Sequence, residues 1–339
     1  MKIGLVGFAA AGKSTVFSAL TTVDPSSGRG GLGTIRVPDD RVDALAALCH
    51  PRKTTYAEIT FEDYPTGAFG PRGRGLTPAV LGDMRTLDVL AEVVDAFSTS
   101  AGDAAAAVAD FRAELLLSDL AVVEKRLDRL SRERGDPREE EVLRRCREAL
   151  ENDRELRTLD LTGDDRERLS GFRFLTLKPR IVVFNVAEDE AGREASEFSE
   201  RLVDWNLEVV VMSAPIEAEL ARMQPEEAAE FLADLGLDEG ARDRFVAACY
   251  RMLDLITFLT AGEDEVRAWP IRRGTTAVEA AGKIHTDIAR GFIRAEVIRI
   301  EDYLECGGEA ACRKAGKLAT HGKDYEMCDG DVVHFRFNV

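Results

Sequence analysis

The chain has 339 residues, of which 45% are hydrophobic and 32% charged, an ordinary composition for a globular protein of two or three domains. Its formal net charge of −17 argues against a general binder of nucleic acid or of anionic membranes, because so acidic a surface repels phosphate unless basic residues are locally concentrated. No apolar run approaches the roughly 18 residues of a membrane span, and the six scattered cysteines lack metal or redox spacing, so we expect a reduced, cytoplasmic protein without membrane or specific DNA partners.

The amino-terminal segment predicts a strand, a loop and a helix, in that order. Residues 2–6 form a short apolar run that stops at Gly7, and the later run AGKSTVFSAL has helical spacing. The loop GFAAAGKST between them has two glycines separated by four residues and followed by Lys13 and Ser14. The alternative is an accidental glycine turn, which the strand before it and the helix after it disfavour.

This loop has the composition of a phosphate-binding site. Its glycines let successive backbone N–H groups converge on phosphate oxygens, and the following helix adds the positive end of its dipole. Lys13 would reach the β and γ phosphates and is the candidate catalytic residue, while the Ser14 hydroxyl would ligate Mg²⁺. The predicted ligand is a nucleoside triphosphate with magnesium, bound by Gly7, Ala9, Ala10, Ala11, Gly12, Lys13, Ser14 and Thr15.

Two further apolar runs, residues 57–63 and 89–97, are typical of buried parallel strands. Asp63 ends the first of them, where a carboxylate can hold magnesium through its water, although aspartate is also a common turn residue. Switch proteins place a glycine three residues after this aspartate to sense the γ phosphate. Here that position is Thr66 and the glycine is Gly67, so the sensor is displaced or absent.

A long helical insertion is predicted over residues 98–174. Leucine and valine recur at three and four residues in two charged segments, which predicts two antiparallel helices joined by a turn at GDPR. Strand patterns resume only at RIVVFN (180–185) and EVVVM (208–212). The sheet domain is therefore predicted to be discontinuous, from residues 1–97 and 175–254.

Base recognition is expected at the ends of these two later strands. Asn185 can bond a purine ring nitrogen and brace the loop, and the backbone of Ser213 and Ala214 can contact the base edge. A guanine-specific site normally follows this asparagine with a lysine and then an aspartate, whereas here Val186 and Ala187 precede Glu188. We therefore expect ATP rather than GTP, with Glu188 as the acidic residue nearest the base.

Residues 255–339 have short strands with glycine turns, which predict a small α+β domain. Between Arg267 and Arg299 lie seven Lys or Arg and three Asp or Glu residues, the one stretch with a basic excess suited to RNA. An ordinary solvated face is the alternative, and the sequence alone favours it slightly.

The runs VPDDRVDALAAL near the start, ITFLTAGEDEVRAWPIRRGTTAVEAAGKIHTDIARGFIRAEVI and the closing KDYEMCDGDVVHFRFNV resemble the YchF-type ATPases among the Obg-related P-loop proteins. The resemblance covers nearly the whole chain. It implies an α/β P-loop nucleoside triphosphatase domain interrupted by a helical hairpin, followed by an α+β, β-grasp, TGS-like domain over residues 255–339. It also implies an ATP-preferring hydrolase that contacts the ribosome or ribosomal RNA through the TGS-like domain and the helical arm.

Three positions depart from the family pattern. The first switch, residues 24–33, is short and glycine-rich without a clear threonine for magnesium, the second switch has Thr66, and Glu92 replaces a frequent histidine. Ground-state binding rests mainly on loop amides and Lys13, whereas acceleration needs a positioned water and full charge neutralisation. Binding should therefore survive better than turnover, and structural or surface roles are expected for His50, His285, His321 and His334.

Three functions are consistent with these patterns. The first is a slow, Mg²⁺-dependent ATPase switch that signals to a ribosomal partner. The second is a nucleotide-binding adaptor with little or no hydrolysis, and the third, disfavoured by Glu188, is a GTPase.

Overall fold

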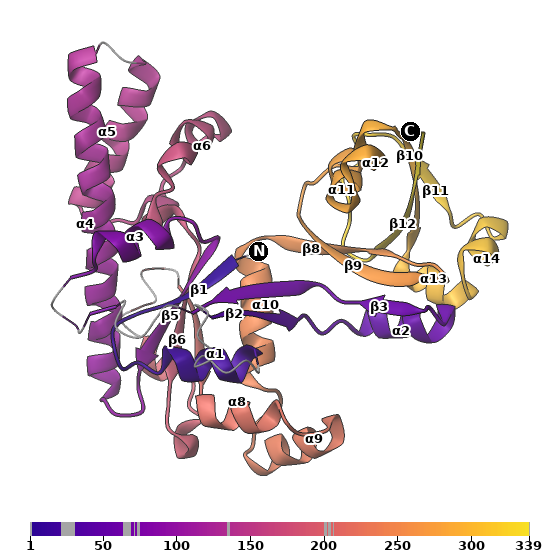
Figure 1. Cartoon of the computed structure of the whole chain (residues 1–339), viewed down its shortest axis with the longest axis horizontal. Coiled ribbons are helices and arrows are strands. Elements are labelled where there is room, and N and C mark those ends of the chain that lie inside the picture. The colour runs from indigo at the N-terminus through magenta and orange to yellow at the C-terminus, as the bar shows by residue number, and fades with distance from the viewer. Residues whose placement is uncertain are drawn as a thin grey trace. The chain divides into compact units, whose positions relative to one another are not determined.

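The computed structural model describes residues 2–21, 31–63, 69–70, 72, 75–133, 136–199, 202, 205 and 207–338 (Figure 1). The chain divides into two compact units, the first made of residues 1–35 and 60–248 and the second of residues 36–59 and 249–339. The sequence places residues 36–59 in the nucleotide-binding domain, whereas in the structure they pack with the second unit. The reason is a long-range contact, because β3 (Lys53–Thr55) pairs in parallel with β9 (Glu265–Arg272).

The first unit is built on a sheet whose six described strands lie in the order β2-β4-β1-β5-β6-β7. The pairs β1-β4, β1-β5, β5-β6 and β6-β7 are parallel, as continuous apolar runs joined by helical crossovers require. The sheet places the carboxyl ends of its central strands at one edge. Its strands are β1 (Lys2–Val6), β2 (Leu32–Arg36), β4 (Glu58–Glu62), β5 (Val89–Asp95), β6 (Arg180–Asn185) and β7 (Glu208–Met212).

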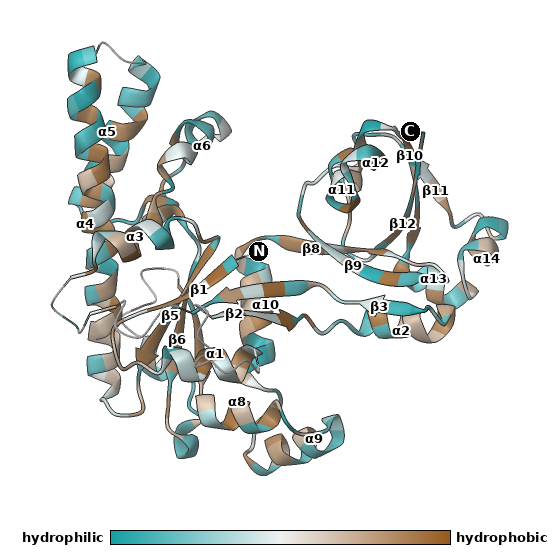
Figure 2. Ribbon diagram, viewed as in Figure 1, coloured by the Kyte–Doolittle hydropathy of each residue, from teal (hydrophilic) through white to brown (hydrophobic). Residues whose placement is uncertain are grey.

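The strands form where β-branched residues are buried on both faces. All six residues of β6 are buried, and Figure 2 shows the hydrophobic colouring concentrated on β1, β5 and β6. The helices of this unit are α1 (Lys13–Thr21), α3 (Pro78–Met84), α4 (Ala101–Glu133), α5 (Pro137–Glu151), α6 (Gly163–Leu169), α7 (Ser196–Ser199), α8 (Ala214–Leu220), α9 (Pro225–Asp234) and α10 (Ala241–Met252). Short 3-10 turns are η2 (Leu156–Thr158), η3 (Ser170–Phe172), η4 (Leu175–Leu177) and η5 (Glu188–Glu190).

Helices α4 and α5 form the predicted antiparallel pair and project beyond the sheet (Figure 1). Their facing sides share one apolar cluster that includes Val123, Leu130, Val142, Leu143 and Cys146. The second helix begins with an Asp136 cap and Pro137, which favours a sharp start, while Gly135 of the predicted turn lies outside the described residues. No described helix is both long enough and apolar enough to cross a membrane.

The second unit holds a sheet whose described strands have the order β11-β10-β12-β8-β9-β3. The strands β8 and β9 form an antiparallel hairpin, and β12 lies between β8, to which it is parallel, and β10, to which it is antiparallel, which is the β-grasp arrangement that the resemblance implies. Alanines of α11 pack against the aromatic and aliphatic face of this sheet. The remaining elements are α2 (Asp40–Cys49), β8 (Leu255–Thr260), α11 (Ala277–Ile284), α12 (Thr286–Arg290), β10 (Phe292–Arg299), α13 (Ile300–Cys306), α14 (Glu309–Lys314), β11 (Ala319–His321) and β12 (Asp331–Phe337).

Candidate functional site

The phosphate loop lies between the end of β1 and the start of α1, at the carboxyl edge of the sheet. Gly7 has a φ of 124° and its backbone passes so close to β5 that a Cβ would meet the Val93 carbonyl oxygen at 2.4 Å. Gly12 has a φ of 83°, and a Cβ there would meet Asn185 Nδ2 at 2.3 Å. Only glycine fits either position, which is the physical reason for the spacing of the motif. Ala10 between them also has a positive φ, 68°.

The Lys13 side chain folds back over this loop. Its Nζ donates to the carbonyl oxygens of Gly7 at 3.0 Å and Phe8 at 2.7 Å, and it lies 4.9 Å from the centre of the Phe69 ring. Burial of the ammonium lowers the pKa of Lys13 to about 8, while the nearby Asp63 carboxylate raises it. The lysine is therefore held at the loop as a partly desolvated cation, poised for an anion.

The candidate magnesium residues come from two elements of the same edge. Ser14 is half-buried in the first turn of α1, and Asp63 is buried just beyond β4, with its amide donating to the Gly31 carbonyl at 2.8 Å. A hydroxyl and a carboxylate are hard oxygen donors of the kind that Mg²⁺ prefers. Among the residues that the structure describes, no group of three or more His, Cys, Asp or Glu is arranged to hold a metal ion. Ala11 of the loop is buried and Thr15 exposed.

Asn185 ties the phosphate loop to the neighbouring strand end. Its Nδ2 donates to the Ala11 carbonyl at 3.3 Å, and its Oδ1 accepts from the Ala214 amide at 3.2 Å. The side chain is buried, so both ends of its amide are used to hold the two loops together. These two hydrogen bonds are the contacts by which Asn185 can brace the loop, and the Ala214 amide is already hydrogen-bonded to Asn185. Ser213 Oγ is buried without a hydrogen-bond partner among the described residues, and Glu188 is exposed on the turn after β6.

The segment after Asp63 also contacts the phosphate loop, which the sequence did not indicate. The Ala9 amide donates to the Gly70 carbonyl at 3.1 Å, and Phe69 is buried beneath Lys13. The one available signal was the single aromatic residue in the glycine-rich run PTGAFGPRGRG. Thr66 and Gly67, and residues 24–30 of the first switch, lie outside the described residues.

Glu92, taken from the sequence as a departure that touches hydrolysis, has a different place in the structure. Its carboxylate accepts from Arg180 Nη1 at 2.7 Å, and Arg180 Nη2 donates to Glu155 at 2.7 Å. All three side chains are buried. Burial raises the pKa of Glu92 to about 7, although the neighbouring Arg180 guanidinium by itself lowers that pKa. Arg180 is the first residue of β6, so this network joins β5 and β6 to the chain that returns from the hairpin.

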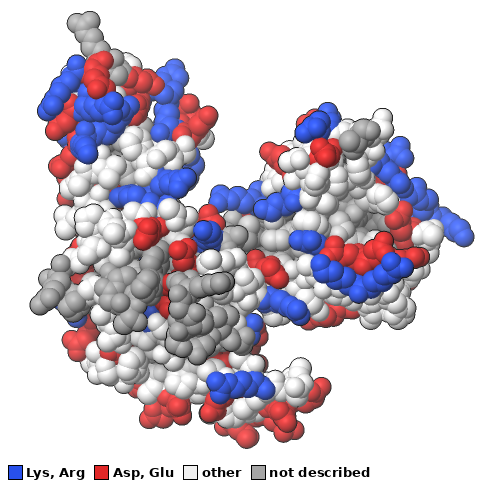
Figure 3. Space-filling view, in the orientation of Figure 1, with Lys and Arg blue, Asp and Glu red and all other residues white. Residues whose placement is uncertain are grey.

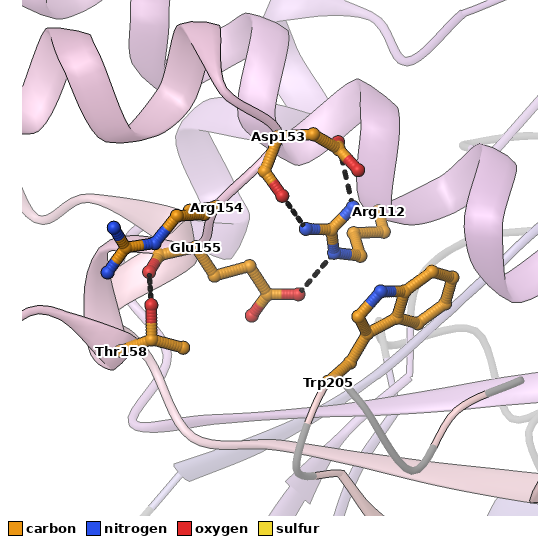
Figure 4. A pocket seen from close by; sticks show the side chains of 6 residues that line it. All are labelled: Arg112, Asp153, Arg154, Glu155, Thr158 and Trp205. Carbon is orange, nitrogen blue, oxygen red and sulfur yellow. Dashed lines mark hydrogen bonds and ion pairs between the residues drawn. The ribbon is translucent and has the colours of Figure 1, made fainter.

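A cavity of about 250 Å³ lies beside this network, lined by Arg112 of α4, residues 153–155, Thr158 and Trp205 (Figure 4). The Arg112 guanidinium lies 4.7 Å from the centre of the Trp205 ring and donates to Asp153 Oδ1 at 2.8 Å. Glu155 connects the cavity to Arg180 at the amino end of β6, whereas Asn185 and the phosphate loop mark the carboxyl end. The cavity is therefore separate from the phosphate loop, and ion pairs already satisfy much of its lining.

Comparisons with known proteins agree with this architecture. A family model, YchF-GTPase_C, described as a protein of unknown function (DUF933), matches residues 255–338. The chain is 38% identical to the Ribosome-binding ATPase YchF of Bacillus subtilis (strain 168) over 99% of both chains, and 34% identical to Obg-like ATPase 1 of Oryza sativa subsp. japonica over 100% of this chain and 92% of that protein. The solved Schizosaccharomyces pombe YchF GTPase superposes with a TM-score of 0.88 at 29% identity, over 99% of this chain and 97% of that one.

Proposed function

Because the chain belongs to the YchF family of P-loop proteins, we propose that it binds ATP with Mg²⁺, hydrolyses it slowly, and uses the nucleotide state as a switch on the ribosome. The observation that carries the proposal is the phosphate loop itself. Gly7 and Gly12 adopt positive φ, Lys13 lies across the loop, and Asn185 holds it in place. The ribosome is proposed as the partner because a relative is named a ribosome-binding ATPase. A protein bound to ribosomes would be located in the cytoplasm.

Binding of the triphosphate follows from the donors at the loop. Backbone amides of the loop and the first turn of α1 would contact the phosphate oxygens, and Lys13 would move from its carbonyl partners to the β and γ phosphates. Ser14 and Asp63 would hold Mg²⁺ directly or through its water. When bound, the ion would neutralise charge that develops on the phosphate oxygens.

The preference for ATP rests on the turn after β6. Glu188 follows Asn185 by three residues and is exposed there, one methylene longer than the aspartate of guanine-specific sites, and no lysine precedes it. The names of the relatives include both ATPase and GTPase, so a comparison of the two nucleotides is the direct test of the base. Tighter binding of GTP than of ATP in calorimetric titrations with Mg²⁺ would revive the GTPase alternative.

Slow turnover is expected because no described side chain at the loop is an evident base for the attacking water. All four histidines belong to the second unit, where His285 caps α12 and His321 stacks on Tyr325 with ring centres 3.9 Å apart. The same observation favours the adaptor alternative, in which ATP stabilises a ribosome-docking fold without useful hydrolysis.

The test is phosphate release from ATP by the full chain and by Lys13→Ala. We expect slow turnover that Lys13→Ala abolishes and that Lys125→Ala, on the exposed side of the hairpin, leaves unchanged. Turnover equal to that of Lys13→Ala would refute the ATPase. If ATP still raises the melting temperature and changes ribosome co-sedimentation, the adaptor is supported; if it does neither, the adaptor is rejected as well.

A further inference from the structure

The basic stretch that the sequence indicated, Arg267 to Arg299, is divided in the structure. Arg267 stacks on Trp269 of its own strand, with the guanidinium 4.0 Å from the ring centre, and Arg273 pairs with Asp254 at 3.0 Å. A cluster of three arginines is formed instead by three elements that only the fold brings together. We call these residues the arginine triad: Arg294 of β10, Arg313 of α14 and Arg336 of β12.

The triad converges on one buried carboxylate. Glu296 accepts from Arg294 and Arg313 at 2.9 Å each, and from Arg336 at 3.1 Å and 3.2 Å. The Glu296 side chain is 2% exposed, whereas those of the three arginines are 51%, 48% and 42% exposed. Arg336 and its two companions hold the pKa of Glu296 at about 2, so the carboxylate stays charged. Each guanidinium has five N–H donors, and the hydrogen bonds to Glu296 and Glu309 use only some of them, so the half-exposed triad has donors to spare.

The arrangement carries more positive charge than the packing requires. Arg294 and Arg336 are direct partners in the antiparallel pairing of β10 and β12, a position where two like charges repel and where only Glu296 lies between them. Glu296 can neutralise one of the three cations, and Glu309 binds Arg313 at 2.9 Å, which leaves a local excess. A single arginine would satisfy Glu296. The excess therefore indicates an anionic partner outside the chain.

The surroundings are suited to an extended polyanion. Thr320 of β11 pairs with Glu296 and is exposed, which adds a hydroxyl on the same face as the triad. In Figure 3, Lys and Arg side chains gather along the β11 and α14 side of this unit. Planar guanidinium groups bind phosphate oxygens in pairs, and a buried carboxylate that fixes their orientation reduces the entropy lost on binding. On a chain of net charge −17, such a cluster would direct phosphate to one place.

We propose that the arginine triad on β10, β12 and α14 binds the phosphate backbone of ribosomal RNA. This surface rests on the proposed ribosome association and specifies the chemistry of that contact. The triad residues come from three elements. Two of these arginines, Arg313 and Arg336, lie outside the basic stretch seen in the sequence. RNA phosphate is favoured over an acidic protein segment because the three guanidinium groups come from separate elements and are each partly exposed. They can therefore contact successive phosphates of an extended backbone, whereas a single carboxylate would need one enclosed pocket.

The test compares two full-length variants with the same change in net charge. The first replaces the triad and its carboxylate, Arg294→Gln, Arg313→Gln, Arg336→Gln and Glu296→Gln, so that no buried charge is left unpaired. The control replaces Arg273 and Arg290, exposed arginines of the same unit, with glutamine. Binding to purified bacterial ribosomes and to a protein-free ribosomal RNA stem-loop is measured over a range of salt concentrations. Arg336→Gln alone, which leaves Glu296 with two partners, provides a milder variant if the fourfold change unfolds the chain.

We expect the fourfold variant to bind both probes about tenfold or more weakly, with the slope of log affinity against log salt reduced by about 2, and the control to change less than about twofold. Equal binding by the triad variant and the control, with wild type bound, would overturn the triad surface while leaving ribosome association intact. Loss of ribosome binding without loss of RNA binding would overturn RNA as the partner in favour of a ribosomal protein. Absence of wild-type binding to ribosomes would instead refute the proposed function.

Discussion

Lys13 should take up a proton when the triphosphate binds, and the extent follows from its surroundings. Burial lowers its pKa to about 8 in the free chain, so about one-tenth of the lysines are neutral at pH 7 and about nine-tenths at pH 9. Phosphate oxygens bind the charged form, which restores the ammonium in the complex. Uptake of about 0.1 proton at pH 7 and about 0.9 proton at pH 9 is therefore expected per nucleotide bound.

The sign of the pH dependence follows directly. The affinity for the triphosphate is highest below the pKa of Lys13 in the free chain and falls as the pH rises through about 8. Well above that pKa, the affinity falls about tenfold, or 1.4 kcal/mol, for each further pH unit. The terminal phosphate, with a pKa near 6, is already ionised there and contributes little. The lysine is thus the group whose titration dominates this range.

The assay is calorimetric titration of Mg²⁺ and ATP at pH 9 in pairs of buffers that differ in ionisation enthalpy, which yields the number of protons exchanged. Lys13→Arg is the matched control, because its guanidinium stays charged and should take up no proton. Proton uptake near zero in the wild-type chain at pH 9 would refute the reasoning. Equal uptake by wild type and Lys13→Arg would assign the proton to another group.

Two predictions concern the frame around the loop. Arg180→Met should lower the free energy of unfolding at pH 7 by about 3 kcal/mol, because Glu92 is left buried without its arginine partner, while Glu155 keeps Arg112 and Arg157. Chemical denaturation measures this loss, the exposed Arg144→Met is the control, and a loss below about 1 kcal/mol would contradict the network. Asn185→Ala should weaken triphosphate binding about tenfold, since two loops lose their shared hydrogen-bonding side chain. Unchanged affinity in the same titration would show that the loops hold their positions without it.

The sequence was sufficient for features that short segments determine. The glycine spacing around Lys13 reports the backbone conformation directly, because only glycine accepts the φ and the close approach found at Gly7 and Gly12. Runs of valine and isoleucine identified the buried parallel strands. Leucine spacing identified the long helices, whose apolar cluster is where that spacing places it.

Features that depend on which distant segments meet could not be read in the same way. Residues 36–59 join the second unit because β3 pairs with a strand more than 200 residues later in the chain, and no local pattern encodes that register. From the sequence alone, Glu92 is expected at the surface or in an active site. Only the fold shows that Arg180, 88 residues away, lies beside it as a buried partner. The arginine triad likewise exists only once β10 and β12 pair and α14 packs beside them.

The resting contacts of the phosphate loop connect the ligand to the hairpin. A triphosphate that draws Lys13 away from the Phe8 carbonyl also removes the cation from the Phe69 ring, and one that uses the Ala9 amide must replace the Gly70 carbonyl. Phe69 is buried in the same cluster as Phe111 of α4, and the Phe8 and Phe111 rings meet edge to face with centres 5.7 Å apart. Since close-packed side chains cannot move independently, we expect a change at Lys13 and Phe69 to be felt by Phe111 at the base of the hairpin. The contact of Phe8 with Phe111 would thus let α4 respond to a nucleotide at the phosphate loop, although none of its residues belongs to that loop.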